Sequence, residues 1–264
     1  MKHFGPMDPA ARPDPAPRVP VLGLGICPVT PEQAAAEVAA WARAGQHRTV
    51  CFANAPMAME AHEDPAFAEA VNGADLVVPD GIPLVWALRL QGCRDQARIR
   101  GADLMLAVCA LAEAQQLPVG LHGARPEVLE RLVDRLRDQF PRLQLVYAWS
   151  PPARALDAAT DAAVARAIAA SGARILLVGL GCPGQEAWMA RHRDRIPAVL
   201  LGVGAAFDVH AGTLAQAPRW MRRLGLDRCF HLAREPRRLW RRCLRQHPRF
   251  LVLLARQLVG TRRR

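Results

Sequence analysis

Polar residues with catalytic potential follow three short apolar segments of this sequence. Asn54 and Asp80 each come at the end of such a segment, and a glycine-rich loop, 179–186, follows the third. A carboxylate in this place can act as a general base toward a hydroxyl group, and the N–H groups of a glycine-rich loop can bind a diphosphate. Asp80 is equally well placed to cap a helix from Pro83, so its spacing alone leaves both roles open.

The loop 179–186 also fits the dinucleotide-binding pattern G-x-G-x-x-G, with its glycines at Gly179, Gly181 and Gly184. Its place late in the chain and the proline inside the turn weaken that interpretation. Asp208 lies at about the right distance for a ribose-binding acid, but it does not directly end a strand. A dinucleotide-binding oxidoreductase that uses this loop stays as the alternative to an enzyme that binds a nucleotide sugar.

The sequence contains none of the common metal-binding motifs considered for this chemistry. There is no D-x-D triplet to hold a metal-bound diphosphate, and the eight histidines include no H-x-x-x-H pair. The seven cysteines are an odd number without a C-x-x-C spacing, which indicates free thiols in a reducing compartment. We therefore expect no metal and no cofactor, and we expect arginines to neutralise any departing diphosphate.

The elements that position these residues follow from a regular alternation. Hydrophobic residues make up 51% of the 264 residues, enough for a large core. Apolar segments of five to seven residues alternate with amphipathic helical segments, which is typical of a parallel sheet that helices cover on both faces. The sequence predicts an α/β fold with a mostly parallel, Rossmann-like sheet. Strands are expected at 19–25, 48–54, 75–79, 118–122, 143–148, 174–179 and 198–203.

Helices are expected in the intervals between these strands, and the chain divides into three parts. Residues 1–18 are rich in proline and alanine and are expected to form a disordered leader. Residues 19–212 form the α/β catalytic domain, and residues 213–264 form an arginine-rich helical appendage. The expected helices are 30–45, 56–62, 65–72, 83–91, 102–116, 126–139, 153–170 and 185–195.

The positive charge is concentrated at the C-terminal end. Residues 218–264 hold fifteen arginines and two acids, whereas the whole chain has a net charge of +11, so the remainder is slightly acidic. Such asymmetry indicates a polyanionic partner. Because apolar residues interleave with these arginines, an anionic membrane surface is favoured over nucleic acid. The residues expected to insert are Trp240, Leu244, Phe250 and Leu253, with further contacts from Trp220.

The sequence shows neither a signal peptide nor a membrane-spanning segment. Its first twenty residues lack a continuous apolar core, and the apolar run at 250–255 is far too short to span a bilayer. We therefore expect a cytoplasmic protein that is peripheral on the inner face of the cell membrane.

Several short motifs follow one another between residues 21 and 242. They are Phe52–Ala55, Pro79–Pro83, Arg100–Leu104, Ser150–Pro152, Val178–Glu186, Gly202–Asp208, Ala217–Met221, Gly225–Asp227 and Glu235–Leu239. In this order they resemble the WecG/TagA/CpsF family of bacterial glycosyltransferases (glycosyltransferase family 26).

The resemblance implies an inverting transferase that moves a sugar from a UDP-sugar donor to a polyprenyl-diphosphate-linked acceptor. The transferred sugar is N-acetylmannosamine, its uronic acid, glucuronate or another hexose. The family's general base is matched by Asp80, and its sugar-nucleotide site is matched by Asn54, Asp103 and Gln185. Gly181 contributes a backbone N–H group, and Glu186 either joins the site or only decorates a helix turn. Arg238 of the appendage is expected to stabilise the departing UDP.

The sequence departs from the family pattern at several positions. Phe52 stands where some members have threonine, which bears on the choice of donor, and Gly184 replaces a frequent lysine. Gln216 replaces an arginine, and Arg228 and His231 replace a tryptophan and an arginine. The last three changes bear on how the appendage contacts phosphate.

Overall fold

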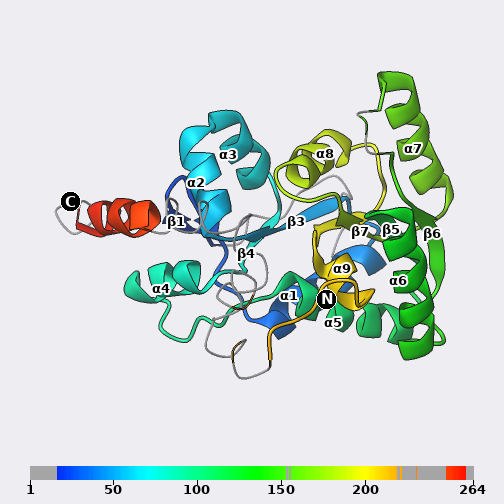
Figure 1. Ribbon diagram of the computed structural model, residues 1–264, viewed down its shortest axis with the longest axis horizontal. Coiled ribbons are helices and arrows are strands. Elements are labelled where there is room, and N and C mark those ends of the chain that lie inside the picture. Colours follow the sequence, from blue (N-terminus) through cyan, green and yellow to red (C-terminus); the bar gives the residue numbers. More distant parts are fainter. Residues whose placement is uncertain are drawn as a thin grey trace, which may run out of the picture.

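The protein is described by a computed structural model that places residues 17–152, 154, 156–218, 221, 230 and 248–259. A central sheet with helices on both faces dominates the molecule (Figure 1). Most of the predicted leader and most of the predicted appendage lie outside the described residues. The division at residue 212 therefore stays a prediction.

The central sheet has six strands in the order β4-β3-β8-β7-β5-β6, and every neighbouring pair is parallel. All six carboxyl ends therefore lie along one edge of the sheet. The predicted parallel Rossmann-like sheet is confirmed. Its strands are β3 (Arg48–Ala53), β4 (Leu76–Pro79), β5 (Val119–Gly123), β6 (Leu145–Trp149), β7 (Ile175–Gly179) and β8 (Val199–Gly202).

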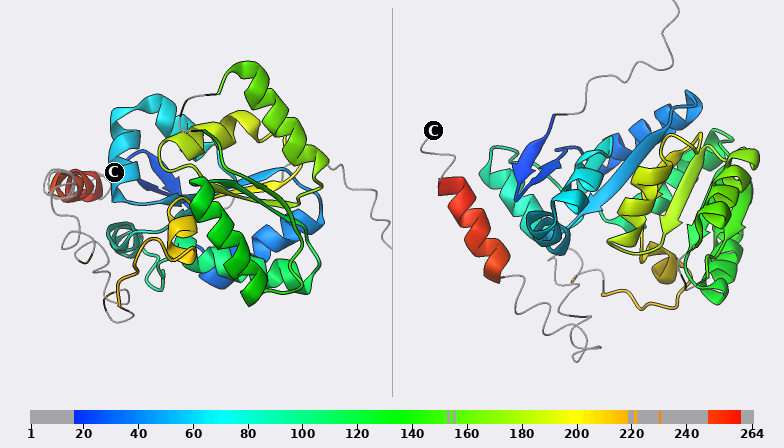
Figure 2. Two further views of the ribbon diagram at one scale, coloured as in Figure 1. Left: turned by 45° about the vertical axis from the view of Figure 1, so that its right-hand side comes forward. Right: turned by 90° about the horizontal axis from the view of Figure 1, so that it is seen from above.

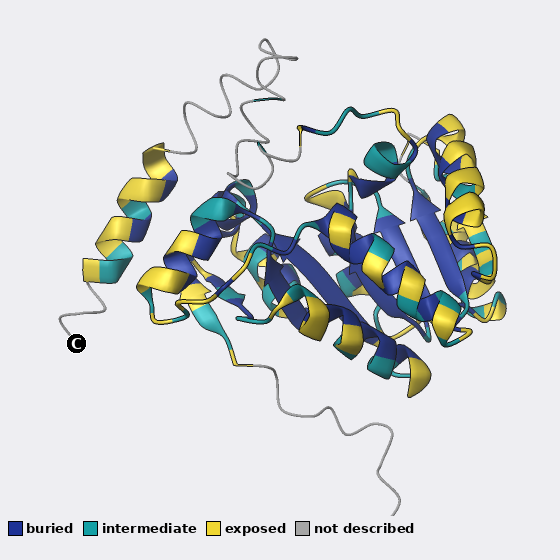
Figure 3. Ribbon diagram, turned by 90° about the horizontal axis from the view of Figure 1, so that it is seen from below, coloured by how far each residue is buried: buried dark blue, intermediate teal, exposed yellow. Residues whose placement is uncertain are grey.

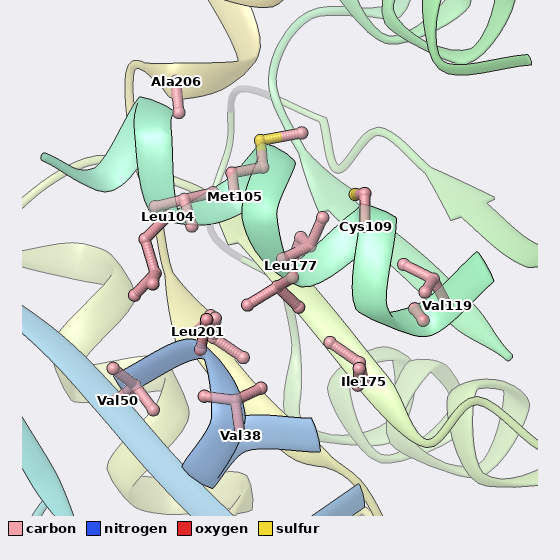
Figure 4. Packing of buried hydrophobic residues seen from close by; sticks show 14 of the residues in the cluster. Val38, Val50, Leu104, Met105, Cys109, Val119, Ile175, Leu177, Leu201 and Ala206 are labelled. Atoms are coloured by element: carbon pink, nitrogen blue, oxygen red, sulfur yellow. The ribbon is translucent and has the colours of Figure 1, made fainter. Parts of the chain in front are cut away.

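Helices cover both faces of this sheet because both faces of its central strands are apolar. One hydrophobic cluster lies under α1 (Pro31–Arg43), α5 (Gly101–Ala114), α6 (Pro126–Gln139) and α9 (Ala206–His210) (Figure 4). The other cluster lies under α2 (Ala55–Glu63), α3 (Pro65–Asn72), α4 (Ile82–Leu90), α7 (Ala158–Ala170) and α8 (Gly184–His192). Successive residues of one strand point to opposite faces, so Leu177 of β7 belongs to the first cluster and Leu176 to the second.

Helix starts follow the local signals in the sequence. Thr30 and Gln33 form a reciprocal capping box at the start of α1. Asp64 and Asp157 cap α3 and α7 by accepting hydrogen bonds from backbone N–H groups. The predicted start of α7 at 153 is wrong by several residues, because the helix begins only after its cap at Asp157.

The first predicted strand is also wrong in kind. Residues 19–25 do not form a strand of the central sheet but belong to an antiparallel hairpin of β1 (Val19–Val21) and β2 (Leu24–Ile26). Leu22 and Gly23 between them have φ of +48° and +89°. Two successive positive φ angles make the tight turn that a two-residue hairpin requires. The apolar run is therefore folded back on itself and packs beside α4.

A further helix, residues 248–259, packs at the end of the molecule that carries β1 and α4 (Figure 2). Phe250 and Leu254 of this helix belong to the same buried cluster as Leu84 and Leu88 of α4. Phe250 is only 1% exposed, so its predicted insertion into a membrane is wrong. Trp220, Trp240 and Leu244 lie outside the described residues.

Candidate active site

Asn54 and Asp80 leave neighbouring strands side by side. Their preceding residues, Ala53 and Pro79, are register partners of the parallel pair β3–β4. The Asp80 N–H group continues that pairing by donating to the Ala53 carbonyl at 2.8 Å. A Cβ atom at Gly81 would lie 3.4 Å from the Asn54 Cα, which is van der Waals contact, so the two loops lie against each other. Two sequence-predicted site residues are thus brought together.

Asp80 is not the helix cap that its spacing allowed. The N-cap of α4 is Gly81, and no side chain caps this helix. The Asp80 side chain turns instead toward the start of α5, where its Oδ2 atom accepts a hydrogen bond from Gly101 N at 3.4 Å. Its Oδ1 atom lies 3.4 Å from Arg98 Nε but accepts no hydrogen bond from any described residue. Oδ1 is thus a buried acceptor, ion-paired with Arg98, that receives no hydrogen bond from the described residues.

Burial raises the pKa of the Asp80 carboxyl from its ordinary value of 3.8 to about 6. The Arg98 guanidinium, the Gly101 N–H group and the Arg100 guanidinium oppose this rise because each favours the charged form. At pH 7 the group is thus mostly ionised, yet it is a stronger base than an ordinary aspartate. This is the tuning that general base catalysis near neutral pH requires.

Three helix N-termini surround Asp80. Helix α2 starts directly after Asn54, α4 starts after Gly81, and α5 points its first N–H group, from Gly101, at the Asp80 carboxylate. Arg98 also donates from Nε to the backbone carbonyl of Asp80 at 3.0 Å. Helix N-termini carry partial positive charge, and with two arginines they favour an anionic ligand such as a diphosphate.

Asn54 and Asp103 have local roles that leave part of each side chain available. Asn54 caps α2, and its Oδ1 atom accepts from Met57 N at 3.2 Å, while its side-chain NH₂ group donates to no described residue. Asp103 is exposed in the first turn of α5 and accepts from Arg100 Nη1 at 3.2 Å on both carboxylate oxygens. Asp103 therefore holds the guanidinium of Arg100 close to the Asp80 region.

The glycine-rich loop joins β7 to α8 at the same edge of the sheet. Gly179 ends β7, Gly181 adopts φ of +80°, and Gly184 begins α8. A Cβ atom at Gly179 would lie 2.7 Å from the Phe207 ring, so this position requires a glycine. The loop thus has the strand–loop–helix geometry of a diphosphate-binding turn.

Gln185 and Glu186 in the first turn of α8 are both buried and bonded to each other. Gln185 Nε2 donates to Glu186 Oε1 and to the Gly202 carbonyl, each at 2.8 Å. Gln185 Oε1 and Glu186 Oε2 are buried without a hydrogen-bond partner among the described residues. Burial raises the pKa of the Glu186 carboxyl, and its hydrogen bond with Gln185 opposes that rise. Glu186 therefore does not face solvent, and its predicted part in the site stays a prediction.

A second buried polar group lies farther along the sheet. His122 of β5 stacks between Trp149 of β6 and Trp188 of α8, with ring centroids 5.5 and 4.4 Å away, and His192 stacks on Trp188 at 4.4 Å. Desolvation lowers the pKa of His122 to about 4, so its imidazole is neutral at pH 7. This stack packs the second half of α8 onto the sheet.

The remaining predicted residues fall in different places. Phe52 is buried beneath the start of α5, where a Cβ atom at Gly101 would lie 3.6 Å from its ring. Gln216 is half-buried in the described segment that follows α9. Arg238, Arg228 and His231 lie outside the described residues.

Sequence reasoning missed Arg98 and did not single out Arg100. Both precede Gly101, and the pattern of two alternating arginines directly before a helix N-terminus is a signal for anion binding. Asp80 lies 18 residues before Arg98 and 20 residues before Arg100 in the sequence. The two arginines come near it only because the intervening loop folds back along the sheet edge.

Neither a metal cluster nor a membrane-spanning helix is found in the part of the chain that the structure describes. No three His, Cys, Asp or Glu side chains gather there as metal ligands. None of the helices there is long and apolar enough to cross a membrane.

A doubly wound parallel sheet with a buried carboxyl, two arginines and several helix N-termini at its carboxyl edge is typical of enzymes that bind phosphate-bearing ligands. Comparison with known proteins gives the particular family. The chain belongs to the WecG/TagA/CpsF family of glycosyltransferases, whose family model matches residues 19–264. The predicted family and the predicted enzyme class, a glycosyltransferase, are confirmed.

Two curated relatives are similar to this chain over about three quarters of their length. The N-acetylglucosaminyldiphosphoundecaprenol N-acetyl-β-D-mannosaminyltransferase of Bacillus spizizenii is 33% identical over 196 residues, which cover 74% of each chain. The enzyme of the same name from Bacillus subtilis is 31% identical over 192 residues, or 72% of this chain and 73% of its own. Both names describe transfer of N-acetylmannosamine to a lipid-linked N-acetylglucosamine.

Proposed function

We propose that this protein transfers N-acetylmannosamine from a UDP-sugar to N-acetylglucosamine on a polyprenyl diphosphate, with inversion at the anomeric carbon. The names of the relatives support this sugar and this acceptor over the uronic acid, glucuronate and other hexoses. The observation that carries the proposal is the Asp80 carboxylate at the carboxyl edge of the sheet, whose Oδ1 atom accepts no hydrogen bond from the described residues.

Asp80 is the general base of the proposed reaction. The acceptor hydroxyl oxygen attacks the anomeric carbon of the donor while its proton passes to Asp80 Oδ1. The bond from the anomeric carbon to the diphosphate breaks at the same time, and UDP departs with that electron pair. A single displacement needs one base and inverts the anomeric centre, and a single carboxylate suffices for it.

The negative charge that develops on the departing UDP requires cationic partners. Arg98 and Arg100, with the N-terminus of α5, lie beside Asp80 and are placed to supply them. Arg98 also orients the base, since its Nε atom contacts both the backbone and the carboxylate of Asp80. Arg238 of the C-terminal segment is proposed to add a further phosphate contact.

The remainder of the donor is proposed to extend along the sheet edge toward α8. Strands β3 and β8 separate β4 from β7, so the 179–186 loop begins about 14 Å from Asp80, given a strand spacing of about 4.8 Å. Gly181 would offer its backbone, and Gln185 its unpartnered Oε1 atom, to polar groups of the donor. Glu186 would act by holding Gln185, and Asn54 and Asp103 would border the sugar.

The place of action follows from the acceptor. A polyprenyl diphosphate keeps its lipid chain in the bilayer, so the enzyme is proposed to work as a peripheral protein on the cytoplasmic face. The C-terminal segment, with fifteen arginines over residues 218–264, is proposed to bind anionic lipids.

The test is a transfer assay with purified protein, UDP-N-acetylmannosamine and a lipid-linked N-acetylglucosamine acceptor. The proposal expects one disaccharide product and one UDP per turnover, with the opposite anomeric configuration to that of the donor. Competing UDP-sugars in the same assay test the choice of sugar. Binding of NAD(P)H with a change in nicotinamide absorbance, and no sugar transfer, would support the oxidoreductase alternative instead.

A further inference from the structure

The loop between α4 and α5, residues 91–100, carries the two arginines that act on Asp80. In Figure 3 the central strands of the sheet are dark blue, for buried, and the connecting loops are mainly yellow and teal, for exposed and intermediate residues. Gln96 differs from most of its loop, since it is only 6% exposed. Glutamine is mostly exposed in folded proteins, and a buried amide requires hydrogen-bond partners. The partners of Gln96 therefore define how this loop is held.

The Gln96 side chain ties the loop to a distant part of the chain. Its Nε2 atom donates to the Val29 carbonyl at 2.8 Å and to the Ala97 carbonyl at 2.7 Å. Val29 lies 67 residues earlier, between β2 and α1, and packs against the first hydrophobic cluster. The two bonds use both protons of the amide NH₂ group. One side chain thus fastens the loop to the core and fixes the peptide carbonyl directly before Arg98.

Two backbone contacts hold the loop on either side of Arg98. The Gln96 carbonyl accepts a hydrogen bond from Arg89 Nε of α4 at 3.1 Å. The Ile99 N–H group donates to the carbonyl of Pro79, the last residue of β4, at 2.9 Å, and Ile99 is fully buried. Arg98 therefore lies between one anchor at Gln96 and another at the strand that presents the base.

The contact between Arg98 and Asp80 depends on this placement of the loop. Arg98 Nε donates to the Asp80 backbone carbonyl at 3.0 Å and lies 3.4 Å from its Oδ1 atom. Because one nitrogen makes both contacts, a shift of the loop by about 1 Å would take it beyond hydrogen-bond distance. An arginine side chain also has many rotamers, so it stays in one of them only where its backbone is fixed.

We propose that Gln96 is a positioning residue of the active site, whose amide holds the 91–100 loop so that Arg98 stays on Asp80. This inference rests on the proposed function, in which Asp80 is the base and Arg98 orients it. Gln96 itself bonds to backbone carbonyls, so its effect on the reaction passes through Arg98.

The test compares Gln96→Met with Gln91→Met in the full chain. Methionine is similar in length and tolerates burial, but it cannot donate a hydrogen bond. Gln91 is a matched control, because its Nε2 atom also donates to two carbonyls, those of Pro20 and Ala87, at 3.2 Å. We expect Gln96→Met to lower kcat/KM at pH 7 by about tenfold, since a displaced group near the reacting atoms is costly. Gln91→Met should keep the wild-type value.

The pH profile of kcat/KM separates positioning from a loss of stability. Arg98, Arg100 and the Gly101 N–H group each favour the ionised form of Asp80. Displacement of Arg98 removes one of these partners, so the acidic limb should move upward from about pH 6. We expect a shift of about half a pH unit or more, since a nearby opposite charge changes a carboxyl pKa by about 1–3 units. Gln91→Met should leave the limb in place, even where thermal unfolding shows both variants to be less stable.

A double variant tests whether Gln96 acts through Arg98. Residues that act as a unit are not additive, so Gln96→Met should change kcat/KM of Arg98→Gln by less than about twofold. Gln96→Asn keeps the amide on a shorter side chain and should shift the acidic limb in the same direction, which provides the measurement if Gln96→Met does not fold.

The outcomes distinguish this inference from the proposed function. A wild-type pH profile in a folded Gln96→Met or Gln96→Asn protein would overturn the inference, and so would losses that add up in the double variant. Absence of sugar transfer by the wild-type protein at every pH would refute the proposed function instead.

Discussion

Asp80 and Glu186 are two buried carboxyl groups at the same edge of one sheet, yet their surroundings differ. Burial raises the pKa of both groups. The groups that oppose the rise at Asp80 include two guanidinium groups, and its side chain retains about a quarter of its exposure. The groups that oppose it at Glu186 are neutral, and the residue is 1% exposed. Arginines and access to solvent mark a reacting group, whereas neutral partners and full burial mark a positioning group.

The largest expected effect is that of Asp80→Asn. This change keeps the shape but removes the base, so turnover should fall by about 10²–10⁴-fold. Because the ionised carboxyl is held where burial raises its pKa, its removal should not lower the unfolding temperature at pH 8. Steady-state transfer and thermal unfolding check both points. Turnover close to that of the wild type in a folded variant would exclude Asp80 as the base.

The pH dependence of kcat/KM should follow the ionisation of Asp80. The active form is the ionised one and its pKa is raised to about 6, so activity is complete above that pH and is lost below it. One pH unit lower, at pH 5, kcat/KM should be about tenfold reduced. Arg98→Gln removes a group that lowers this pKa, so the loss should begin at a higher pH. An unchanged profile in Arg98→Gln would contradict the assigned electrostatics.

Glu186→Gln should have a much smaller effect on turnover. The new amide oxygen can still accept the hydrogen bond from Gln185 Nε2, so the position of Gln185 is kept. We expect turnover within about threefold of the wild type, which is the range for a retained neutral hydrogen bond. Glu186→Ala is the comparison variant, and it should raise the KM for the donor by releasing Gln185. A loss in Glu186→Gln as large as that in Asp80→Asn would make Glu186 a reacting group.

Chelation should have no effect. The sequence lacks the D-x-D triplet that usually holds a metal-bound diphosphate, and arginines near Asp80 are placed to balance the charge of the diphosphate. Turnover in EDTA should therefore equal turnover in untreated buffer. A fall in EDTA that magnesium or manganese reverses would show that the donor needs a cation.

Residues whose structure depends on near neighbours were predicted well. Thr30 and Gln33 cap their helix as their three-residue spacing predicts, because capping depends on groups within one turn. The parallel sheet followed from apolar runs alternating with helical segments, since each pattern reports which sides of an element are buried. The same local patterns placed Asn54, Asp80 and the 179–186 loop at strand ends, before any contact between them was known.

Contacts between distant segments had to come from the tertiary structure. Arg98 lies against Asp80 because the chain folds back over 18 residues. Phe250 lies in the core with Leu84 and Leu88, which are more than 150 residues earlier in the sequence, and not in a membrane. The apolar run at 19–25 is a hairpin because two successive positive φ angles reverse it. Periodicity reports that a residue is apolar and on which side of its element it lies. It does not report what lies opposite, and only the packed chain decides which carboxyl lies beside arginines and keeps an oxygen without a hydrogen bond.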